Sequence, residues 1–397
     1  MKKLLLASTI LAGLTGAAFA DGHEVKMGVI LGFTGPIESL TPNMAAAAEL
    51  AMKEASDSGK LLDGKVVVPV RGDSTCTDSG AAVAAAERLV TSDNVVAIFG
   101  ADCSGVTTAI VNQVATPNGV ISISPSATSP ALTTIEDKGY FFRTAPSDAR
   151  QGQVLADVLK ERGITKVAVT YTNNDYGKGL ADSFKTAFEA NGGEIAISAA
   201  HEDGKADYSA EVGALSAAGA DHLAVFGYVD QGGRGIIQTS LDTGAFDKFI
   251  LADGMIGESL IEAIGVDLNG TIGTLPGSDS DGAAKFKEVA TAGGLEKNDG
   301  PYMPESYDAA ALAILAMQAA KSTDRAAIQA QIMNVANAPG EKIMPGELAK
   351  ALEILAAGGQ VDYEGASNVS FTAVGEATGS FKELEVKDGK FETIKIR

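Results

Sequence analysis

The sequence predicts an α/β protein built from two doubly wound parallel sheets, and three observations support this fold class. Short β-branched runs alternate with longer alanine-rich stretches, an order that implies right-handed βαβ crossovers and sheets covered on both faces. The alternation comes in two series, which predicts two domains. The chain has 397 residues, of which 45% are hydrophobic, so two globular cores are within its reach.

The first series lies between residues 25 and 124. Its valine- and isoleucine-rich runs fit a pleated, buried surface, and alanine favours helix in the stretches between them. The predicted strands are Val25–Leu31, Val66–Arg71, Val95–Gly100 and Val120–Ser124. The predicted helices are Met44–Ser58, Ser79–Thr91 and Gly105–Ala115.

The second series lies between residues 151 and 252 and follows the same logic, now with a helix first. The predicted helices are Gln151–Arg162, Gly179–Asn191, Ala210–Ala218 and Gly232–Thr243. The predicted strands are Val167–Tyr171, Glu194–Ala200, His222–Phe226 and Phe249–Ala252.

The composition argues against several functions. With 31 basic and 51 acidic side chains the net charge is −20, whereas a nucleic-acid-binding protein needs a basic surface to displace counterions. Three histidines and two cysteines leave little for a metal site or a histidine-based triad. No nucleophile elbow, phosphate-binding loop or strand-linked dinucleotide motif occurs, and Asp279-Ser280-Asp281 is more typical of a solvated loop than of a calcium site. We expect no catalytic residue, no metal and no cofactor.

Residues 1–20 have the three parts of a cleavable export signal. Two lysines follow the first methionine, residues 4–14 are apolar but too few to span a bilayer, and Ala18-Phe19-Ala20 forms a cleavage site. A buried N-terminal helix is the alternative. No cysteine follows the cleavage site, so no lipid anchor is expected. We expect a soluble, exported mature chain that begins at Asp21.

Export also affects how the cysteines are interpreted. Cys76 and Cys103 lie 27 positions apart, and an oxidising compartment favours a disulfide between them. Two buried free thiols, or half of a metal site, are the alternatives.

Ligands of doubly wound sheets bind at the carboxyl ends of the strands, where the next loop opens a helix. Serine and threonine residues are frequent in these loops, although small hydroxyl residues beside helix starts are also ordinary N-caps. The loops so identified are Gly32–Asn43, Gly100–Val106, Ser124–Leu132 and Tyr171–Leu180.

Several short motifs in and after these loops are individually weak but specific in their order. They are Gly32-Phe33-Thr34-Gly35-Pro36, Asp73-Ser74-Thr75-Cys76 with Cys103-Ser104, Ile123-Ser124-Pro125-Ser126-Ala127-Thr128-Ser129-Pro130, Phe142-Arg143-Thr144, Asn174-Asp175-Tyr176-Gly177-Lys178-Gly179, Gly227-Tyr228 and Asp362-Tyr363-Glu364-Gly365. Through them the chain resembles the leucine/isoleucine/valine-binding protein family, the branched-chain amino-acid type of ABC-transporter solute-binding protein. The resemblance covers essentially the whole chain after residue 20.

The resemblance implies the type I periplasmic binding protein fold: two Rossmann-like lobes joined by three hinge crossings. After the signal peptide at residues 1–20, lobe one would hold residues 21–144 and 276–381, and lobe two residues 145–275 and 382–397. The crossings would be Phe142-Arg143-Thr144, Thr271–Pro276 and Phe381–Val386. The segment Asn337–Glu347 is an elaboration found in a subset of similar proteins.

The resemblance also implies the site residues. Ser104, Ser126 and Thr128 would hold a ligand carboxylate, and Asp253 would hold its ammonium group. Three aromatic residues would close over the ligand, namely Tyr176, Tyr228 and Tyr302. The alternatives are an N-cap for Ser104 and a solvated turn for Asp253. One departure concerns Ile37–Met44, which lacks the aromatic residue usual there and has Leu40 and Thr41 instead.

The expected function is that of a monomeric periplasmic solute-binding protein that delivers an amino acid, or a related small polar solute, to an ABC permease. A ligand sensor of the same fold is the second hypothesis, and the solute could instead be an amide or an aromatic acid. A secreted enzyme is disfavoured because no nucleophile and base are paired. A LacI-like repressor shares the fold but needs a basic helix-turn-helix, and the export signal stands in its place.

Overall fold

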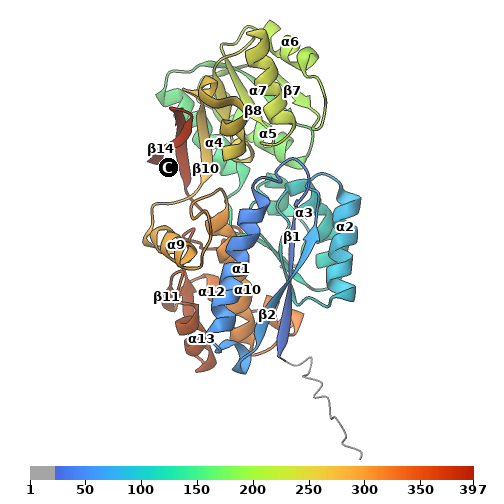
Figure 1. Ribbon diagram of the computed structural model, residues 1–397, viewed down its shortest axis with the longest axis vertical. Coiled ribbons are helices and arrows are strands. Elements are labelled where there is room, and N and C mark those ends of the chain that lie inside the picture. Colours follow the sequence, from blue (N-terminus) through green and yellow to red (C-terminus); the bar gives the residue numbers. More distant parts are fainter. Residues whose placement is uncertain (1–22) are drawn as a thin grey trace, which may run out of the picture.

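The computed structural model describes residues 23–397 and contains two lobes, each with a central sheet (Figure 1). The predicted export signal and the start at Asp21 lie outside this range. Lobe one has a five-stranded parallel sheet in the order β2-β1-β3-β4-β5. Its strands are β1 (Glu24–Leu31), β2 (Val66–Asp73), β3 (Ala97–Gly100), β4 (Ile121–Ser124) and β5 (Phe141–Arg143).

Helices cover both faces of this sheet. Helix α10 packs along α1 and is buried on nearly every side, which suits its alanine-rich sequence because small side chains allow close packing. The helices of lobe one are α1 (Thr41–Asp57), α2 (Ser79–Glu87), α3 (Ser104–Ile110), α9 (Asp281–Ala292), α10 (Met303–Ala320), α11 (Arg325–Gln329), α12 (Ile332–Ala336) and α13 (Leu348–Ala356).

Lobe two has a seven-stranded sheet in the order β14-β13-β10-β9-β8-β6-β7. Strand β13 runs antiparallel to β10, and β14 runs antiparallel to β13. Its strands are β6 (Lys166–Thr172), β7 (Glu194–His201), β8 (His222–Phe226), β9 (Phe249–Leu251), β10 (Ile272–Pro276), β13 (Phe381–Lys387) and β14 (Lys390–Ile396). Its helices are α4 (Asp148–Glu161), α5 (Asp175–Ala190), α6 (Ser209–Ala217), α7 (Gly232–Thr243) and α8 (Glu258–Ile264).

The chain passes between the two sheets three times. It leaves the first sheet after β5 and enters α4, returns to lobe one between β10 and α9, and goes back to lobe two at β13. The predicted fold class, two Rossmann-like lobes of the type I periplasmic binding protein, is confirmed.

Three helices begin at least three residues earlier than the sequence predicted, and one of them, α1, starts at Thr41 instead of Met44, with a proline in its first turn. Helix α4 starts at Asp148, where the Ser147 hydroxyl accepts the Ala149 N–H, and α5 starts at Asp175, capped by Asn174. The prediction placed these starts where the run of apolar residues begins, but the side-chain cap decides the first turn. Two predicted helices are also shorter, because wider π turns replace α-helical geometry after Glu87 and after Ile110.

The segment Asn337–Glu347 forms one edge of a small parallel pair. Within it, β11 (Glu341–Ile343) pairs with β12 (Val361–Tyr363), and the Asn337 side-chain oxygen accepts the backbone N–H of Phe371. The segment therefore closes the outer end of lobe one.

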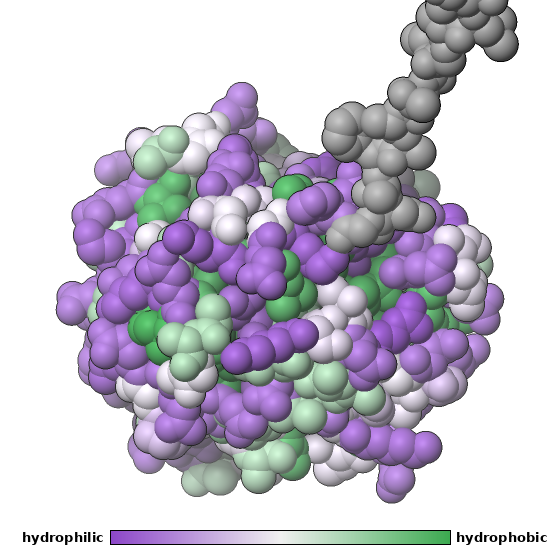
Figure 2. Space-filling model, turned by 90° about the horizontal axis from the view of Figure 1, so that it is seen from below, coloured by the Kyte–Doolittle hydropathy of each residue, from purple (hydrophilic) through white to green (hydrophobic). Residues whose placement is uncertain are grey.

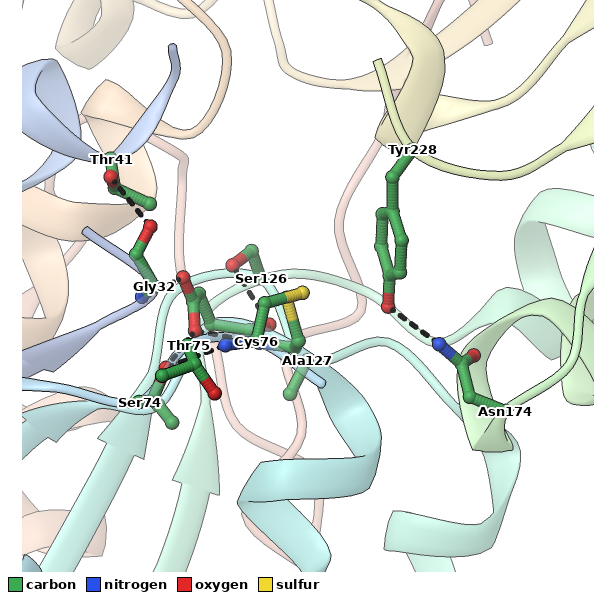
Figure 3. The surroundings of a disulfide bond; sticks show 12 residues. Gly32, Thr41, Ser74, Thr75, Cys76, Ser126, Ala127, Asn174 and Tyr228 are labelled. Carbon is green, nitrogen blue, oxygen red and sulfur yellow. Dashed lines mark hydrogen bonds between the residues drawn. A yellow bond between two sulfur atoms is a disulfide. The ribbon is translucent and has the colours of Figure 1, made fainter. Parts of the chain in front are cut away.

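The predicted disulfide between Cys76 and Cys103 is confirmed, with 5.2 Å between the two Cα atoms. Both residues are buried, and the bond joins the loop after β2 to the start of α3 (Figure 3). Neither cysteine is free, so the two alternatives do not hold.

The surface matches the acidic composition. The face of the molecule seen in Figure 2 is covered mainly by hydrophilic side chains, with apolar ones scattered among them. Within residues 23–397 no helix combines the length and the apolar character that a membrane span requires. Nor does this part of the chain gather three His, Cys, Asp or Glu side chains suited to a metal ion.

Removal of the disulfide tests its contribution to stability. Because it closes a loop of 27 positions, replacing Cys76 and Cys103 together by alanine should lower the free energy of unfolding by about 3–4 kcal/mol in the chain-entropy model. Urea denaturation of the purified variant would measure the loss, with the reduced wild type as control. An unchanged midpoint would show that the loops hold their positions without the bond.

Candidate functional site

A small cavity lies between the lobes, at the carboxyl ends of strands from both sheets. Its volume is about 20 Å³, room for about one water molecule, so the side chains nearly fill the space in this closed arrangement. Six of the seven predicted ligand-binding residues line it, and they are Ser104, Ser126, Tyr176, Tyr228, Asp253 and Tyr302. The structure thus brings these side chains together, while their role as ligand contacts stays a prediction.

Ser104 presents a free hydroxyl donor to the cavity. It is the first residue of α3, and the N-cap position before it belongs to Cys103, so Ser104 is not the cap. Its side-chain oxygen accepts the Ser129 backbone N–H at 3.1 Å, and its own O–H has no hydrogen-bond acceptor among the described residues. A hydroxyl in this state can donate to a ligand anion.

Ser126 and Thr128 sit on the next loop but are placed differently. The Ser126 hydroxyl lies 3.1 Å from the Asp102 carbonyl oxygen, to which it donates. Thr128 is fully buried and does not line the cavity, and its hydroxyl makes no hydrogen bond with the described residues. The structure therefore places Thr128 behind the cavity wall.

Arg143 holds this loop in place. Its guanidinium is fully buried and donates to the carbonyl oxygens of Ala127 (3.1 Å) and Ser129 (2.9 Å), and it forms an ion pair with Glu376. A buried charge with such partners fixes the backbone around it, because loss of any one leaves polar groups unpaired. The residue predicted as a hinge crossing thus also shapes the site.

Asp102 lines the cavity and was not among the predicted site residues. Its buried carboxylate accepts the backbone N–H groups of Gly32 (2.6 Å) and Cys103 (3.0 Å) and the Ser74 hydroxyl (3.1 Å). Burial raises the pKa of Asp102, and these hydrogen bonds oppose the rise. Asp102 therefore ties together the loops after β1, β2 and β3. In the sequence, the one indication that Asp102 belongs to the site was its position in the loop Gly100–Val106.

Asp253 is buried, so the alternative that it belongs to a solvated turn does not hold. It begins a short 3₁₀ turn (Asp253–Met255) after β9, and only 2% of its surface is exposed. Tyr176 of α5 donates to one carboxylate oxygen at 2.9 Å, and Tyr302 of lobe one donates to the other. Burial raises the pKa of Asp253, and the hydroxyls of Tyr302 and Tyr176 oppose this by stabilising the carboxylate.

The tyrosines form a wall around this carboxyl group. The rings of Tyr176 and Tyr228 stack with their centroids 5.3 Å apart, and Tyr228 extends from lobe two toward Asn174, whose amide donates to it at 3.3 Å (Figure 3). Tyr302 has a left-handed backbone with φ of 59°, an unusual conformation for a residue with a side chain. Burial raises the pKa of all three phenols well above 10.0, so they remain donors at neutral pH.

The wall formed by the Ile37–Met44 loop is aliphatic. Ile37, Leu40 and Met44 line the cavity where the predicted family pattern has an aromatic residue. Thr41, in contrast, is buried away from the cavity and donates to the Gly32 carbonyl oxygen at 3.0 Å. The departure noted in the sequence thus gives an aliphatic surface in place of an aromatic one.

Hydrogen bonds join the lobes at the mouth of the cleft. Asp230 of lobe two accepts the Ser39 backbone N–H of lobe one at 2.9 Å, and its own N–H donates to the Pro36 carbonyl at 3.0 Å. The Ser259 hydroxyl donates to the same carboxylate at 2.8 Å. This is a closed arrangement, with hydroxyl groups, the carboxyl groups of Asp102 and Asp253 and an apolar wall around an enclosed space. Such a set of groups can bind a small polar molecule.

Comparison with sequences of known proteins gives a consistent result. The family model described as periplasmic binding protein matches residues 24–350. Leu/Ile/Val-binding protein homolog 3 of Brucella melitensis is 33% identical over 282 residues, which cover 69% of this chain and 73% of that protein. The chemotactic signal transduction system substrate-binding protein BasB of Halobacterium salinarum is 27% identical, covering 94% of this chain and 90% of BasB.

Solved structures share the fold. The leucine-binding protein LivK of Thermotoga maritima superposes with a TM-score of 0.78 at 25% identity, covering 94% of this chain and 98% of LivK. An ABC-transporter solute-binding protein of R. palustris in complex with benzoate superposes with a TM-score of 0.75 at 18% identity, covering 94% and 96%.

Two tyrosine variants test how much each phenol stabilises the site. Tyr302→Phe removes a donor from a buried carboxylate and should lower the free energy of unfolding by about 1–3 kcal/mol. Tyr228→Phe is the matched control, because its hydroxyl makes only a long bond with the Asn174 amide and its loss should cost less, about 0.5–1.5 kcal/mol. Urea denaturation of both variants without ligand would compare them. Equal losses would contradict a special role for the bond between Tyr302 and Asp253.

Proposed function

The chain belongs to the periplasmic binding protein family, and on that basis we propose that it is the solute-binding component of an ABC importer for an aliphatic amino acid. Its relatives include proteins named as Leu/Ile/Val-binding proteins and as ABC-transporter solute-binding proteins. The family consists of binding proteins, and this chain captures its ligand between the lobes without chemical change.

The arrangement of polar and apolar groups in the cavity carries the proposal. A zwitterion needs uncharged donors at one end and a carboxylate at the other, and Ser104 and Asp253 supply these from opposite lobes. The aliphatic wall of Ile37, Leu40 and Met44 suits a branched aliphatic side chain. Ser126 and Thr128 support the loop beside Ser104, and the three tyrosines enclose the ligand.

Ligand binding and lobe closure are linked in this proposal. A ligand that touches Ser104 in lobe one and Asp253 in lobe two makes its full set of contacts only when the lobes are closed, so it shifts the open–closed equilibrium. The hydrogen bonds from Ser39 to Asp230 and between the hydroxyls of Ser39 and Ser259 (3.0 Å) join the lobes without touching the ligand. The closed form is then the one delivered to the permease.

Location and partners follow from the same proposal. Residues 1–20 direct export, the mature protein begins at Asp21 and works in the periplasm as a monomer, and the ABC permease in the inner membrane is its partner. The predicted lobe limits, residues 21–144 with 276–381 and residues 145–275 with 382–397, make the two halves of the binding cleft. No nucleic acid is involved, because the net charge of −20 opposes contact with phosphates.

A ligand sensor is the second candidate, because a relative matched over 94% of this chain is a chemotactic substrate-binding protein. Genes for permease and ATPase subunits beside this one would favour transport, and a receptor gene would favour sensing. An aromatic acid is a less suitable ligand, since an ionised Asp253 would face its carboxylate.

A thermal-shift screen tests the proposed ligand class. Leucine, isoleucine, valine, small amides and benzoate are compared, and a ligand present at 100 times its dissociation constant should stabilise the protein by about 2.7 kcal/mol. We expect the aliphatic amino acids to raise the melting temperature. A shift with benzoate or amides alone would overturn the proposal. Intrinsic fluorescence is a poor substitute, because the sequence contains no tryptophan.

Two substitutions test the two ends of the cavity. Asp253→Asn keeps the shape but removes the charged partner of the ammonium group, and should weaken binding by about 2–5 kcal/mol. Ser104→Ala should cost less, about 1.5–3 kcal/mol for a hydrogen bond to a charged group. Calorimetry with the amino acid found in the screen would give both values. If Asp253→Asn binds as tightly as the wild type, the ammonium does not contact Asp253.

A further inference from the structure

A second buried carboxyl group lies beside Asp253 and has no role in the site described so far. Asp148 is the first residue of α4, directly after the first crossing between the lobes. It is fully buried, and neither of its carboxylate oxygens accepts a well-aligned hydrogen bond from the described residues, although the Thr128 hydroxyl lies near enough to oppose the rise in its pKa. Unpaired buried carboxylates are rare because the charged form loses its hydration without compensation.

The surroundings of Asp148 place donors near its carboxyl group but none in a well-aligned hydrogen bond with it. The groups that face it are the carboxyl of Asp253, the hydroxyl of Thr128, the guanidinium of Arg143 and the phenols of Tyr176 and Tyr302. Gln151, one turn along α4, turns its amide N–H to Thr274 of β10 at 3.0 Å, and its own oxygen is unpaired as well. The two unpaired carboxylate oxygens and the Gln151 oxygen therefore leave three acceptors without a donor next to the cavity.

Arg143 does not neutralise this cluster. Its NH1 and NH2 groups are held by backbone carbonyls and by Glu376, and only its Nε remains unpaired. Asp148 and Asp253 therefore face each other with no dedicated cation. Two buried carboxylates at close range cannot both be ionised unless a positive charge joins them, so such a pair retains a proton.

We propose that Asp148 determines the specificity of the cleft by forming a carboxyl pair with Asp253, which holds one proton when the cleft is empty and releases it when a ligand ammonium group binds. This inference rests on the proposed function, because it requires a ligand with a positively charged group next to Asp253. The ammonium replaces the proton as the positive charge of the pair, and the proton goes to the buffer. A neutral or acidic ligand cannot make this exchange and is disfavoured.

The proposal has a definite pH dependence. Burial and the neighbouring Asp253 raise the pKa of Asp148 well above its ordinary value, and burial raises that of Asp253. While the pair is protonated, protons compete with the ligand, so affinity should rise with pH by up to about tenfold per unit. Above the pKa of the empty pair this dependence should vanish.

Calorimetry in two buffers of different ionisation enthalpy counts the protons released. With leucine as the probe and a series of pH values from 5 to 8, the wild type should release up to one proton per ligand bound wherever the empty pair is protonated. Asp148→Asn should release almost none, because Asp253 alone ionises more readily without a second carboxyl beside it. Glu305→Gln is the matched control, since it removes another buried carboxyl group that does not line the cavity and should keep the proton release. Equal proton counts in wild type and Asp148→Asn would overturn the proposal.

A second measurement needs no ligand. A carboxyl whose pKa is raised in the folded state favours folding at acidic pH, and this advantage is lost as the pH rises toward that raised pKa. The melting temperature of the wild type should therefore fall relative to that of Asp148→Asn between pH 5 and pH 8, by about 2 °C or more. A gap that stays constant with pH would show that the pair holds no shared proton.

The two experiments separate this inference from the proposed function. If leucine and other amino acids fail to bind while the melting temperatures behave as expected, the carboxyl pair exists and the ligand assignment is wrong. If amino acids bind without proton release and the temperature gap is constant, the proposed function stands and the proton exchange is wrong.

Discussion

A carboxylate buried between two lobes is the constraint on which the site depends. Asp253 is removed from water, so each of its oxygens needs a donor, and the donors come from different lobes: Tyr176 from lobe two and Tyr302 from lobe one. The hydrogen bond from Tyr302 therefore joins the lobes at the place where a ligand would sit. Closure of the cleft therefore also completes the hydrogen bonds that stabilise the Asp253 carboxylate.

Lobe one offers a prearranged surface to this carboxylate. Asp102 binds the loops after three strands, the disulfide connects two of these loops covalently, and Arg143 holds the loop that carries Ser126 and Thr128. Groups fixed before the ligand arrives lose little conformational entropy on binding. The lobe-one half of the cleft is thus rigid because its own buried polar groups need one another.

The fold was largely predictable, whereas the site was predictable only in part. Alternation of strand and helix is strong where Val and Ile runs meet alanine-rich stretches, but the starts of α4 and α5 depend on the caps Ser147 and Asn174, which apolar periodicity does not report. Six of the residues that the family resemblance predicted for the site line one cavity. Asp102 and Asp148 were missed, because an acidic residue in a loop or at a helix start is usually solvated. Their burial arises from contacts between distant segments.

The path of the chain between the lobes also bears on how the protein folds. The sheet of lobe two is completed by β13 and β14, which belong to the last 17 residues, and lobe one contains the long segment between β10 and β13. Without β13, β10 has an open edge and the sheet of lobe two is incomplete. Such non-local pairing makes folding slow. Each lobe therefore reaches its final structure only after segments that lie far apart in the sequence have paired.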